Sequence, residues 1–557
     1  MRNAGRLLLP IGTTNYKKIC DNYYYVDKTL MIKDILDEGT EISLFTRPRR
    51  FGKTLNMDML RTFFEKQEED TSRYFTDKKI WQQGEAYTKH QGKYPVIYLS
   101  LKDANKLTWS DLYARLIETI RDEFFRHSEL NNSPKISNPE FYKKIIAGQA
   151  TEAEYSISIL RLSRMLREHY GQSVILMIDE YDTPIQAGYI NGFYNEAIQF
   201  IRDLFSSALK DNDNLAFGFL TGILRVAKES IFSGLNNIYV YSVLDDKFSD
   251  YFGFTDMEVK QLVHYYALDD KLAEIKEWYD GYRFGEVEIY NPWSVLSYLK
   301  NGCRAIPYWV QTSSNSTINT ILRNLDGETY QKLKDIINGT AISSIVSTNV
   351  IYPELKDKSA NIFGFLLMTG YLKSSRTNFT MRGNILCDLC IPNKEIENVY
   401  YNEILSQLAD GVSINTTNVL SEALLHKDDV LLKQSLNKFL LETISFYDTL
   451  NENYYHGLLL GMTAIFAHDY YIYSNRESGL GRYDIMLVPK QAGLPGIVIE
   501  VKSTDKSSSA SLKALASRAL AQINTNKYDA ELVKQGVKLI YKYGIAFSGK
   551  QAEIMTN

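Results

Sequence analysis

The stretch Arg47-Pro-Arg-Arg-Phe-Gly-Lys-Thr54 follows an apolar run at 42–45 and precedes an amphipathic run at 55–64. This order predicts a strand, a loop and a helix, the arrangement in which backbone N–H groups at a helix start hold a nucleotide's phosphates. The usual pattern of such a loop begins with a glycine, and here Arg47 takes that position. The stretch nevertheless predicts a phosphate-binding loop at the end of the first buried strand.

Each residue type at the end of this stretch suits a nucleotide. A lysine in such a loop neutralises the β- and γ-phosphate oxygens, and the hydroxyl that follows it ligates Mg²⁺. We therefore expect ATP and Mg²⁺ here, held by Arg50, Phe51, Gly52, Lys53 and Thr54.

A second apolar run, at 174–178, ends in the carboxylates Asp179 and Glu180. Its length and β-branched content predict a buried parallel strand, and ligands bind beyond the carboxyl ends of such strands. Asp179 is the candidate for completing the Mg²⁺ shell, and Glu180 for polarising the attacking water. The alternative for the two acids alone is a solvated strand end.

A third run, at 215–220, ends at Thr221. Because this residue follows a predicted neighbouring strand, Thr221 is a candidate for reading the γ-phosphate, and Arg225 could meet the same phosphate. The alternative for both is capping or structural hydrogen bonding. Strands that alternate with helices in this way predict a parallel sheet with helical crossovers.

A different chemistry is predicted near the C-terminus. Two strands are expected, at 481–489 and 496–502, and Glu500 and Lys502 share one face because they are two positions apart. Asp484 comes from the preceding strand and can lie opposite them. Two carboxylates suit Mg²⁺ or Mn²⁺, and the lysine would orient the attacking water. The alternative is a hairpin with an exposed charged face, but Glu500 and Lys502 end a run that looks buried, where charge is costly.

Composition limits the partners. The 557 residues carry a formal net charge of −4, so any contact with nucleic acid must be local. Residues 497–550 hold nine Lys or Arg against four acids, which suits a phosphodiester substrate. The longest apolar runs are shorter than the ~20 residues of a membrane helix. We expect a soluble, cytoplasmic protein with no membrane contact.

The layout resembles a bacterial family that joins an AAA-ATPase-like domain to a PD-(D/E)XK nuclease superfamily domain. The segments that carry the resemblance are Tyr25-Val-Asp-Lys-Thr29, Arg47–Thr54, Ile178-Asp-Glu-Tyr-Asp182, Leu220-Thr-Gly222, Tyr290-Asn-Pro-Trp293, Tyr455-His-Gly457, Gly481-Arg-Tyr-Asp484, Ile499-Glu-Val-Lys502 and Gln522 to Tyr528. The Arg47 variant looks like the family's own.

The resemblance implies roles for these residues. Lys53 and Thr54 would contact phosphate and Mg²⁺, with Asp179 and Glu180 as the Walker B pair. Asp484, Glu500 and Lys502 would form the nuclease triad. Gln522 matches a supporting helix position, and Glu452 is a candidate extra ligand.

The expected fold is α/β. A P-loop NTPase-type parallel sheet with a helical lid occupies 1–285, and a small helical or winged region with a linker occupies 286–430. A restriction-endonuclease-like α/β domain occupies 431–557.

The expected function is an ATP-driven switch joined to a metal-dependent nuclease, with DNA favoured over RNA. One alternative keeps the switch and has the C-terminal domain only grip nucleic acid or a protein. Another has ATP bound without hydrolysis. Homo-oligomer formation is left open.

Overall fold

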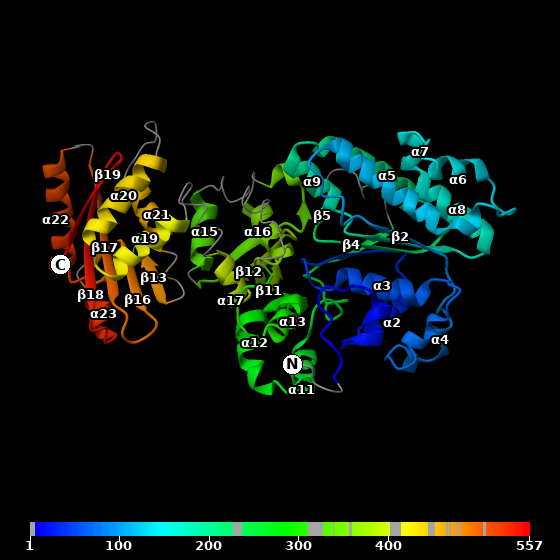
Figure 1. Ribbon diagram of the computed structural model, residues 1–557, viewed down its shortest axis with the longest axis horizontal. Coiled ribbons are helices and arrows are strands. Elements are labelled where there is room, and N and C mark those ends of the chain that lie inside the picture. Colours follow the sequence, from blue (N-terminus) through cyan, green and yellow to red (C-terminus); the bar gives the residue numbers. More distant parts are fainter. Residues whose placement is uncertain are drawn as a thin grey trace. The chain divides into compact units, whose positions relative to one another are not determined.

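The computed structural model describes residues 6–226, 237–309, 327–337, 339–355, 359–400, 414–443, 452–463, 466, 469–474, 477–479, 481–504 and 508–557. The chain forms two compact units, one comprising 1–317 and 326–396 and the other 318–325 and 397–557. Figure 1 colours the first unit from blue to green, and most of the second from yellow to red. In the described part of the chain, no helix combines the length and apolar character that crossing a bilayer needs.

A five-stranded parallel sheet forms the centre of the first unit. Its strands, in spatial order, are β2 (Val96–Ser100), β3 (Val174–Asp179), β4 (Leu215–Gly222), β1 (Ile42–Thr46) and β6 (Ile238–Tyr241). Every residue of β1 and β3 is buried, because helices cover both faces of the sheet. The parallel sheet predicted from the sequence is confirmed, and β4 separates the loop-bearing strand β1 from the acid-bearing strand β3.

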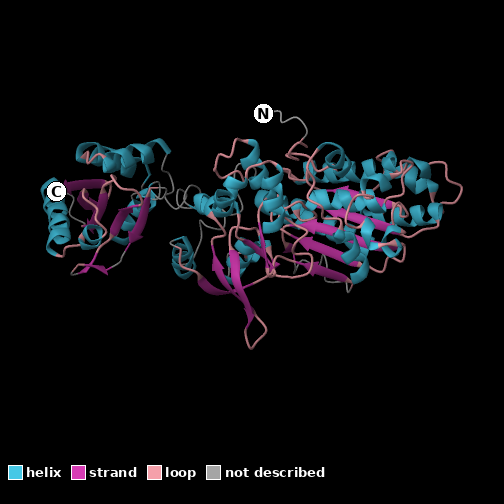
Figure 2. Cartoon of the chain, turned by 90° about the horizontal axis from the view of Figure 1, so that it is seen from below, coloured by secondary structure: helices cyan, strands magenta, loops and turns pink. Residues whose placement is uncertain are grey.

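Helices surround the strands of this sheet (Figure 2), and those on its two faces come from different parts of the chain (Figure 1). Helices α2 (Leu30–Glu38), α3 (Lys53–Phe64) and α4 (Glu85–Thr88) lie on one side, and α5 (Trp109–Arg126) and α8 (Ser158–Tyr170) lie on the other. The remaining helices of this part are α1 (Tyr16–Asn22), α6 (Pro139–Ile146), α7 (Glu152–Ser156), α9 (Thr183–Asn191) and α10 (Tyr194–Leu209).

The rest of the first unit is a helical lid followed by a small mixed region. The lid packs α11 (Asp256–Tyr265), α12 (Leu272–Tyr279) and α13 (Pro292–Lys300) around one apolar cluster, with the hairpin β7 (Tyr282–Phe284) and β8 (Val287–Ile289). The mixed region holds an antiparallel sheet in the order β11 (Lys373–Phe379), β12 (Ile385–Cys390), β9 (Ile342–Val346). Its other elements are α15 (Gly327–Ile337), β10 (Asn349–Val350), α16 (Ser359–Met368) and α17 (Lys394–Val399).

Short 3₁₀ helices connect several of these elements. They span Thr71–Tyr74, Trp81–Gln83, Ser128–Leu130, Asp269–Lys271 and Tyr352–Glu354.

A second five-stranded sheet organises the second unit. Its order is β13 (Tyr470–Ser474), β16 (Ile485–Pro489), β17 (Gly496–Ser503), β18 (Ile540–Ser548) and β19 (Gln551–Thr556). Only the β17–β18 pair is parallel, so the sheet is mixed. The other elements are α19 (Ile414–Leu425), α20 (Asp429–Thr443), α21 (Glu452–Thr463), the β14 (Glu477–Ser478) and β15 (Gly481–Arg482) pair, α22 (Ser509–Thr525) and α23 (Ala530–Lys534). The mixed C-terminal α/β domain predicted from the sequence is confirmed.

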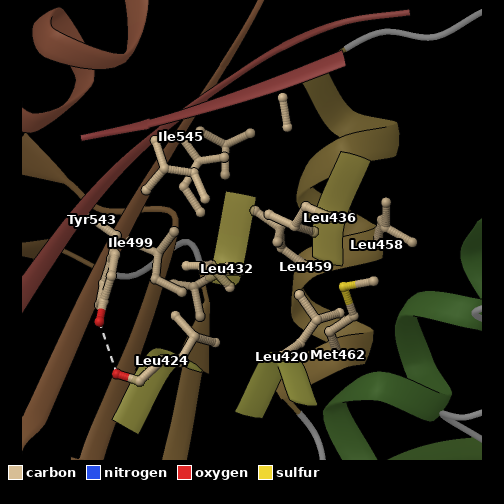
Figure 3. Packing of buried hydrophobic residues seen from close by; sticks show 14 of the residues in the cluster. Leu420, Leu424, Leu432, Leu436, Leu458, Leu459, Met462, Ile499, Tyr543 and Ile545 are labelled. Atoms are coloured by element: carbon tan, nitrogen blue, oxygen red, sulfur yellow. Dashed lines mark hydrogen bonds between the residues drawn. The ribbon is translucent and has the colours of Figure 1, made fainter. Parts of the chain in front are cut away.

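Helices α19, α20 and α21 cover one face of this sheet through a single apolar cluster (Figure 3). Leucines such as Leu424 and Leu436 meet Ile499 of β17 and Ile545 of β18. The hydroxyl of Tyr543 donates to the Leu424 carbonyl at 2.8 Å. The apolar side chains of β17 pack into this cluster, and the same strand carries Glu500 and Lys502.

Candidate functional sites

The predicted phosphate loop, residues 47–52, leaves β1 and leads into the first turn of α3. Gly52 is the N-cap of α3 with φ +84°, and Arg50 has φ +71°. Lys53 and Thr54 are the first two residues of the helix, where unpaired backbone N–H groups favour an anion. The strand, loop and helix predicted from the sequence are therefore present.

Arg47 points into the protein. Its guanidinium is fully buried and donates to the carbonyls of Thr46 at 2.9 Å, Tyr241 at 2.7 Å and Phe248 at 3.2 Å. It lies over the rings of Phe252 and Phe284, and burial lowers its pKa to about 9. At the position where the usual pattern has a glycine, this chain thus has a side chain that ties the loop to the last residue of β6 and to the segment after it.

The ammonium group of Lys53 folds over the loop. It donates to the carbonyls of Arg47 at 3.0 Å and Pro48 at 2.9 Å. Burial lowers the pKa of Lys53, and the nearby carboxylates of Glu180 and Asp182 oppose that shift. A buried cation that faces carboxylates at a helix start is suited to neutralising phosphate oxygens.

Thr54 and Thr221 both hold the carboxylate of Asp179. The Thr54 hydroxyl donates to Oδ2 at 2.8 Å, and the Thr221 hydroxyl donates to Oδ1. Thr54 belongs to α3, Thr221 to β4 and Asp179 to β3. They can meet because β4 lies between β3 and β1, the strand that leads into α3. The structure thus brings together Thr54, Asp179 and Thr221, with Thr221 as a partner of the carboxylate.

Two further acids follow Asp179. Glu180 has φ +54°, and burial raises its pKa, with Lys53 opposing the shift. Asp182 is buried and accepts from the backbone N–H groups of Ile223 at 2.9 Å and Leu224 at 3.0 Å. Burial also raises the pKa of Asp182. Sequence reasoning gave Asp182 no role, although the acidic run Asp-Glu-Tyr-Asp was visible.

A pocket of about 540 Å³ opens against the loop. Its lining includes residues 49–54, Glu180, Asp182, Tyr24 and Trp293. The Arg50 guanidinium lies 4.4 Å from the centre of the Trp293 ring. The sequence did not predict Arg49 or Trp293 as pocket residues. The only signal for Trp293 was the Asn-Pro-Trp turn before α13.

Arg225 lies apart from this pocket lining. It belongs to β5 (Arg225–Val226), which pairs in parallel with β10, and the adjacent Val226 N–H donates to the Tyr181 hydroxyl at 3.0 Å. A contact between Arg225 and phosphate therefore stays a prediction.

In the second unit, Asp484 and Glu500 face each other across an antiparallel pair. Ile485 pairs with Ile499, so the preceding and following residues, Asp484 and Glu500, come opposite one another. The Asp484 carboxylate also accepts from the Val501 N–H at 2.7 Å. Lys502 follows on the same face of β17, as the spacing predicted.

The carboxylate of Glu500 is almost completely buried, with 1% of the residue exposed. Its Oε1 accepts from Lys502 Nζ at 3.1 Å, whereas the buried Oε2 has no hydrogen-bond partner. Burial, followed by the charge of Asp484, raises the pKa of Glu500 to about 7, against the effect of Lys502. A buried carboxylate oxygen without a partner is costly unless another group occupies it.

Two acidic side chains and a lysine fit a hard divalent cation, because carboxylate oxygens are the ligands that Mg²⁺ prefers. The unpaired Oε2 of Glu500, beside Asp484, is the observation that supports this fit. Within the described residues, no group of three or more His, Cys, Asp or Glu side chains gathers to hold a metal.

Three further residues belong to the motifs or candidates of this unit. Gln522 donates to the Tyr528 hydroxyl at 3.1 Å, so it supports Tyr528 beneath the β14–β15 turn. His456 Nε2 lies 3.1 Å from the Asp484 carbonyl and 3.1 Å from the Ser474 hydroxyl, a contact that only the Tyr-His-Gly motif signalled. Glu452 begins α21, and its side chain lies outside the described residues.

Comparison with known proteins matches the two units to two different families. Residues 10–232 match a family model described as a predicted AAA-ATPase (AAA-ATPase_like), and residues 450–557 match one described as PD-(D/E)XK nuclease superfamily. An uncharacterized protein in the vnfD 5' region of Azotobacter chroococcum mcd 1 is 26% identical over 489 residues, which cover 86% of this chain and 81% of that protein. The chain therefore combines an AAA-ATPase-like domain with a C-terminal domain of the PD-(D/E)XK nuclease superfamily.

Proposed function

We propose that the first unit binds ATP with Mg²⁺ in the pocket beside the loop and hydrolyses it. The observation that carries this proposal is the shared carboxylate of Asp179, held by Thr54 from the loop helix and by Thr221 from the intervening strand. The Thr54 hydroxyl and the Asp179 carboxylate are oxygen donors suited to Mg²⁺, and they lie beside a helix start suited to phosphate.

The residues would divide the work by their chemistry. Lys53 would neutralise phosphate oxygens on leaving the loop carbonyls that it now contacts. Thr221 would keep Asp179 oriented, and Glu180 would accept a proton from the attacking water, since burial raises its pKa. A bound Mg²⁺ would add positive charge where the transition state gathers negative charge.

Nucleotide binding and turnover in two variants test this proposal. Lys53→Ala should weaken ATP binding by about tenfold or more, because it removes a charge-assisted contact. Glu180→Gln should leave binding intact and lower turnover by about 10²-fold or more. Wild-type affinity in Lys53→Ala would contradict this site, and ATP bound without turnover in the wild type would favour a binding-only switch.

We further propose that the second unit is a metal-dependent nuclease that cuts nucleic-acid phosphodiesters, with DNA favoured over RNA. The unpaired, buried oxygen of Glu500 opposite Asp484 carries this proposal. The two carboxylates would hold Mg²⁺ or Mn²⁺, and Lys502 would orient the attacking water. The metal would lower the pKa of that water and stabilise the developing charge.

Cleavage of a panel of DNA and RNA, single- and double-stranded, with Mg²⁺ or Mn²⁺ and with or without ATP, tests this proposal. Glu500→Ala and Lys502→Ala should abolish cleavage and keep nucleic-acid binding. Lys438→Ala, which removes an exposed lysine on α20 outside the basic stretch 497–550, is the matched control and should cut like the wild type. The proposal fails if the wild type cuts nothing in the panel.

A second candidate keeps the nucleotide switch and has the C-terminal domain only bind nucleic acid or a protein. The lack of a third metal-ligating side chain among the described residues favours it. Under this candidate the wild-type protein binds nucleic acid or a protein without cutting, and Glu500→Ala binds equally well.

A further inference from the structure

The outer side of the phosphate loop is supported by residues far along the chain. A Cβ atom at Gly370, which has φ +87°, would come within 3.0 Å of the Pro48 side chain. Trp309 is 1% exposed, and its indole N–H donates to the Arg49 carbonyl at 3.2 Å. The ring of Tyr371 packs on that indole with centroids 4.9 Å apart. These contacts come from outside the segment that matches the AAA-ATPase-like model.

A buried carboxylate holds Trp309 in place. Glu395 is fully buried in the first turn of α17, and its Oε1 accepts from the Trp309 backbone N–H at 2.8 Å. The Ser294 hydroxyl lies 2.8 Å from the other oxygen, Oε2. Burial raises the pKa of Glu395 to about 7. Neither the nucleotide pocket nor the carboxylates of the second unit account for an acid at this position.

The hydrogen bond to Arg49 acts on the part of the loop that most needs support. In a trans peptide the C=O and the following N–H point in opposite directions, so a fixed Arg49 carbonyl also fixes the Arg50 N–H. Arg50 has φ +71°, a conformation that a residue with a side chain adopts only when its surroundings impose it. Backbone N–H directions are what a phosphate loop uses to bind its anion.

We infer that, for the nucleotide site proposed above, Glu395 is a positioning residue that orients the Arg49–Arg50 peptide through Trp309. Glu395 holds the Trp309 backbone, the Trp309 indole holds the loop, and the loop presents its N–H groups to phosphate. Glu395 also stands shortly before 397–557, the longer of the two segments that make up the second unit. One member of the loop's support therefore lies directly before that segment along the chain.

Nucleotide affinity in the full-length protein tests this chain of contacts through a double-mutant cycle. Trp309→Phe removes the indole N–H and keeps an aromatic ring, and Glu395→Ala removes the acceptor. Each should weaken ATP binding by about five- to tenfold, the usual effect of one lost hydrogen bond. The double variant should lose little more than either single variant, because both act through one contact.

Two further variants separate positioning from general stability. Glu395→Gln keeps an acceptor for the Trp309 N–H and should bind ATP like the wild type. Glu123→Ala removes another buried carboxylate of the first unit, on α5 beside Arg126, and should lower the melting temperature without changing ATP affinity. A merely structural Glu395 would behave like Glu123.

The outcomes distinguish this inference from the proposed function. Suppose that the wild type binds ATP and that Lys53→Ala does not. If Trp309→Phe and Glu395→Ala then bind ATP like the wild type, the positioning role is wrong and the nucleotide site stands. Additive losses in the double variant would also overturn the positioning role. If the wild type binds no nucleotide, the proposed site and its support fall together.

Discussion

Arg47 stands where the usual phosphate-loop pattern has a glycine, and the strand, loop and helix form nevertheless. A glycine in this position lets the backbone approach phosphate freely, whereas Arg47 turns away and occupies three backbone carbonyls. Its guanidinium is more weakly hydrated than an ammonium group and lies over two aromatic rings, which makes its burial tolerable. The departure therefore concerns how the loop is anchored and leaves Lys53 and Thr54 at the helix start.

Restoring the usual glycine should consequently harm the protein. Arg47→Gly leaves the carbonyls of Tyr241 and Phe248 without their donor and opens a cavity between the rings. We expect the first unit to lose about 3 kcal/mol of stability, measured as a lower melting temperature, with no gain in ATP affinity. Arg47→Met keeps most of the volume and should lose less. Unchanged stability in Arg47→Gly would refute the anchoring role.

Glu500 should make the stability of the second unit depend on pH. Its pKa is raised from 4.5 to about 7, so the folded state binds more protons than the unfolded state between these values. Stability should then fall as pH rises from about 4.5 to 7, by at most about 3 kcal/mol, and the cost is absent below pH 4.5. Glu500→Gln should remove this dependence and be the more stable protein at pH 8.

A bound divalent metal should offset the loss of stability that ionised Glu500 causes at high pH. At pH 8, Mg²⁺ or Mn²⁺ should raise the melting temperature of the second unit in the wild type, because only the folded state offers both carboxylates. Glu500→Gln should respond much less. Calorimetry with and without the metal, from pH 4 to 8, checks both effects. An equal response in the two proteins would contradict metal binding at Glu500.

At the scale of elements, the two sheets place their functional residues by different means. In the first unit, parallel strands end on one edge, so Asp179 and Thr221 meet although they are far apart in sequence. In the second unit, an antiparallel register brings Asp484 opposite Glu500. In both cases a buried strand fixes the geometry, and a polar residue at or near its end carries the chemistry.

A single substitution should disrupt the close packing of helix α22 on strand β18. A Cβ atom at Gly544 would come within 2.3 Å of the Ala516 carbonyl and 2.4 Å of the Leu520 N–H, both backbone atoms of α22. Gly544→Ala should therefore push the helix away and lower the stability of the second unit by about 3 kcal/mol. Ser517→Ala, on the exposed side of α22, should change nothing measurable. Equal melting temperatures for the two variants would contradict this packing.

At the scale of the whole molecule, the residues of the proposed nucleotide site and those of the proposed metal site belong to separate units. If ATP controls the nuclease, Lys53→Ala should keep metal-dependent cleavage and lose its response to ATP, because the residues that cut are untouched. Comparing cleavage rates with and without ATP in the wild type, Lys53→Ala and Lys502→Ala measures this. Loss of all cleavage in a folded Lys53→Ala protein would show that nucleotide is needed for the chemistry itself.

Much of both sites could be predicted from sequence because their signals are local. A short apolar run followed by a loop and an amphipathic run specifies β1, the phosphate loop and α3, and the spacing in Glu-Val-Lys specifies one face of β17. Roles that depend on distant partners could not be predicted in this way. Gln522 serves Tyr528, Arg225 lies in a small parallel pair with β10, and Asp182 accepts from the turn after β4.

By itself, the sequence determined the order of strands and helices, the lysine and hydroxyl at the start of α3, and the acids that follow or end buried strands. These follow from periodicity and from neighbours along the chain. Only the tertiary structure decided that Arg47 anchors the loop, that Thr221 holds Asp179, and that one oxygen of Glu500 is buried without a partner. The physical reason is that hydrogen-bond partners and desolvation are set by packing between segments that are remote in sequence.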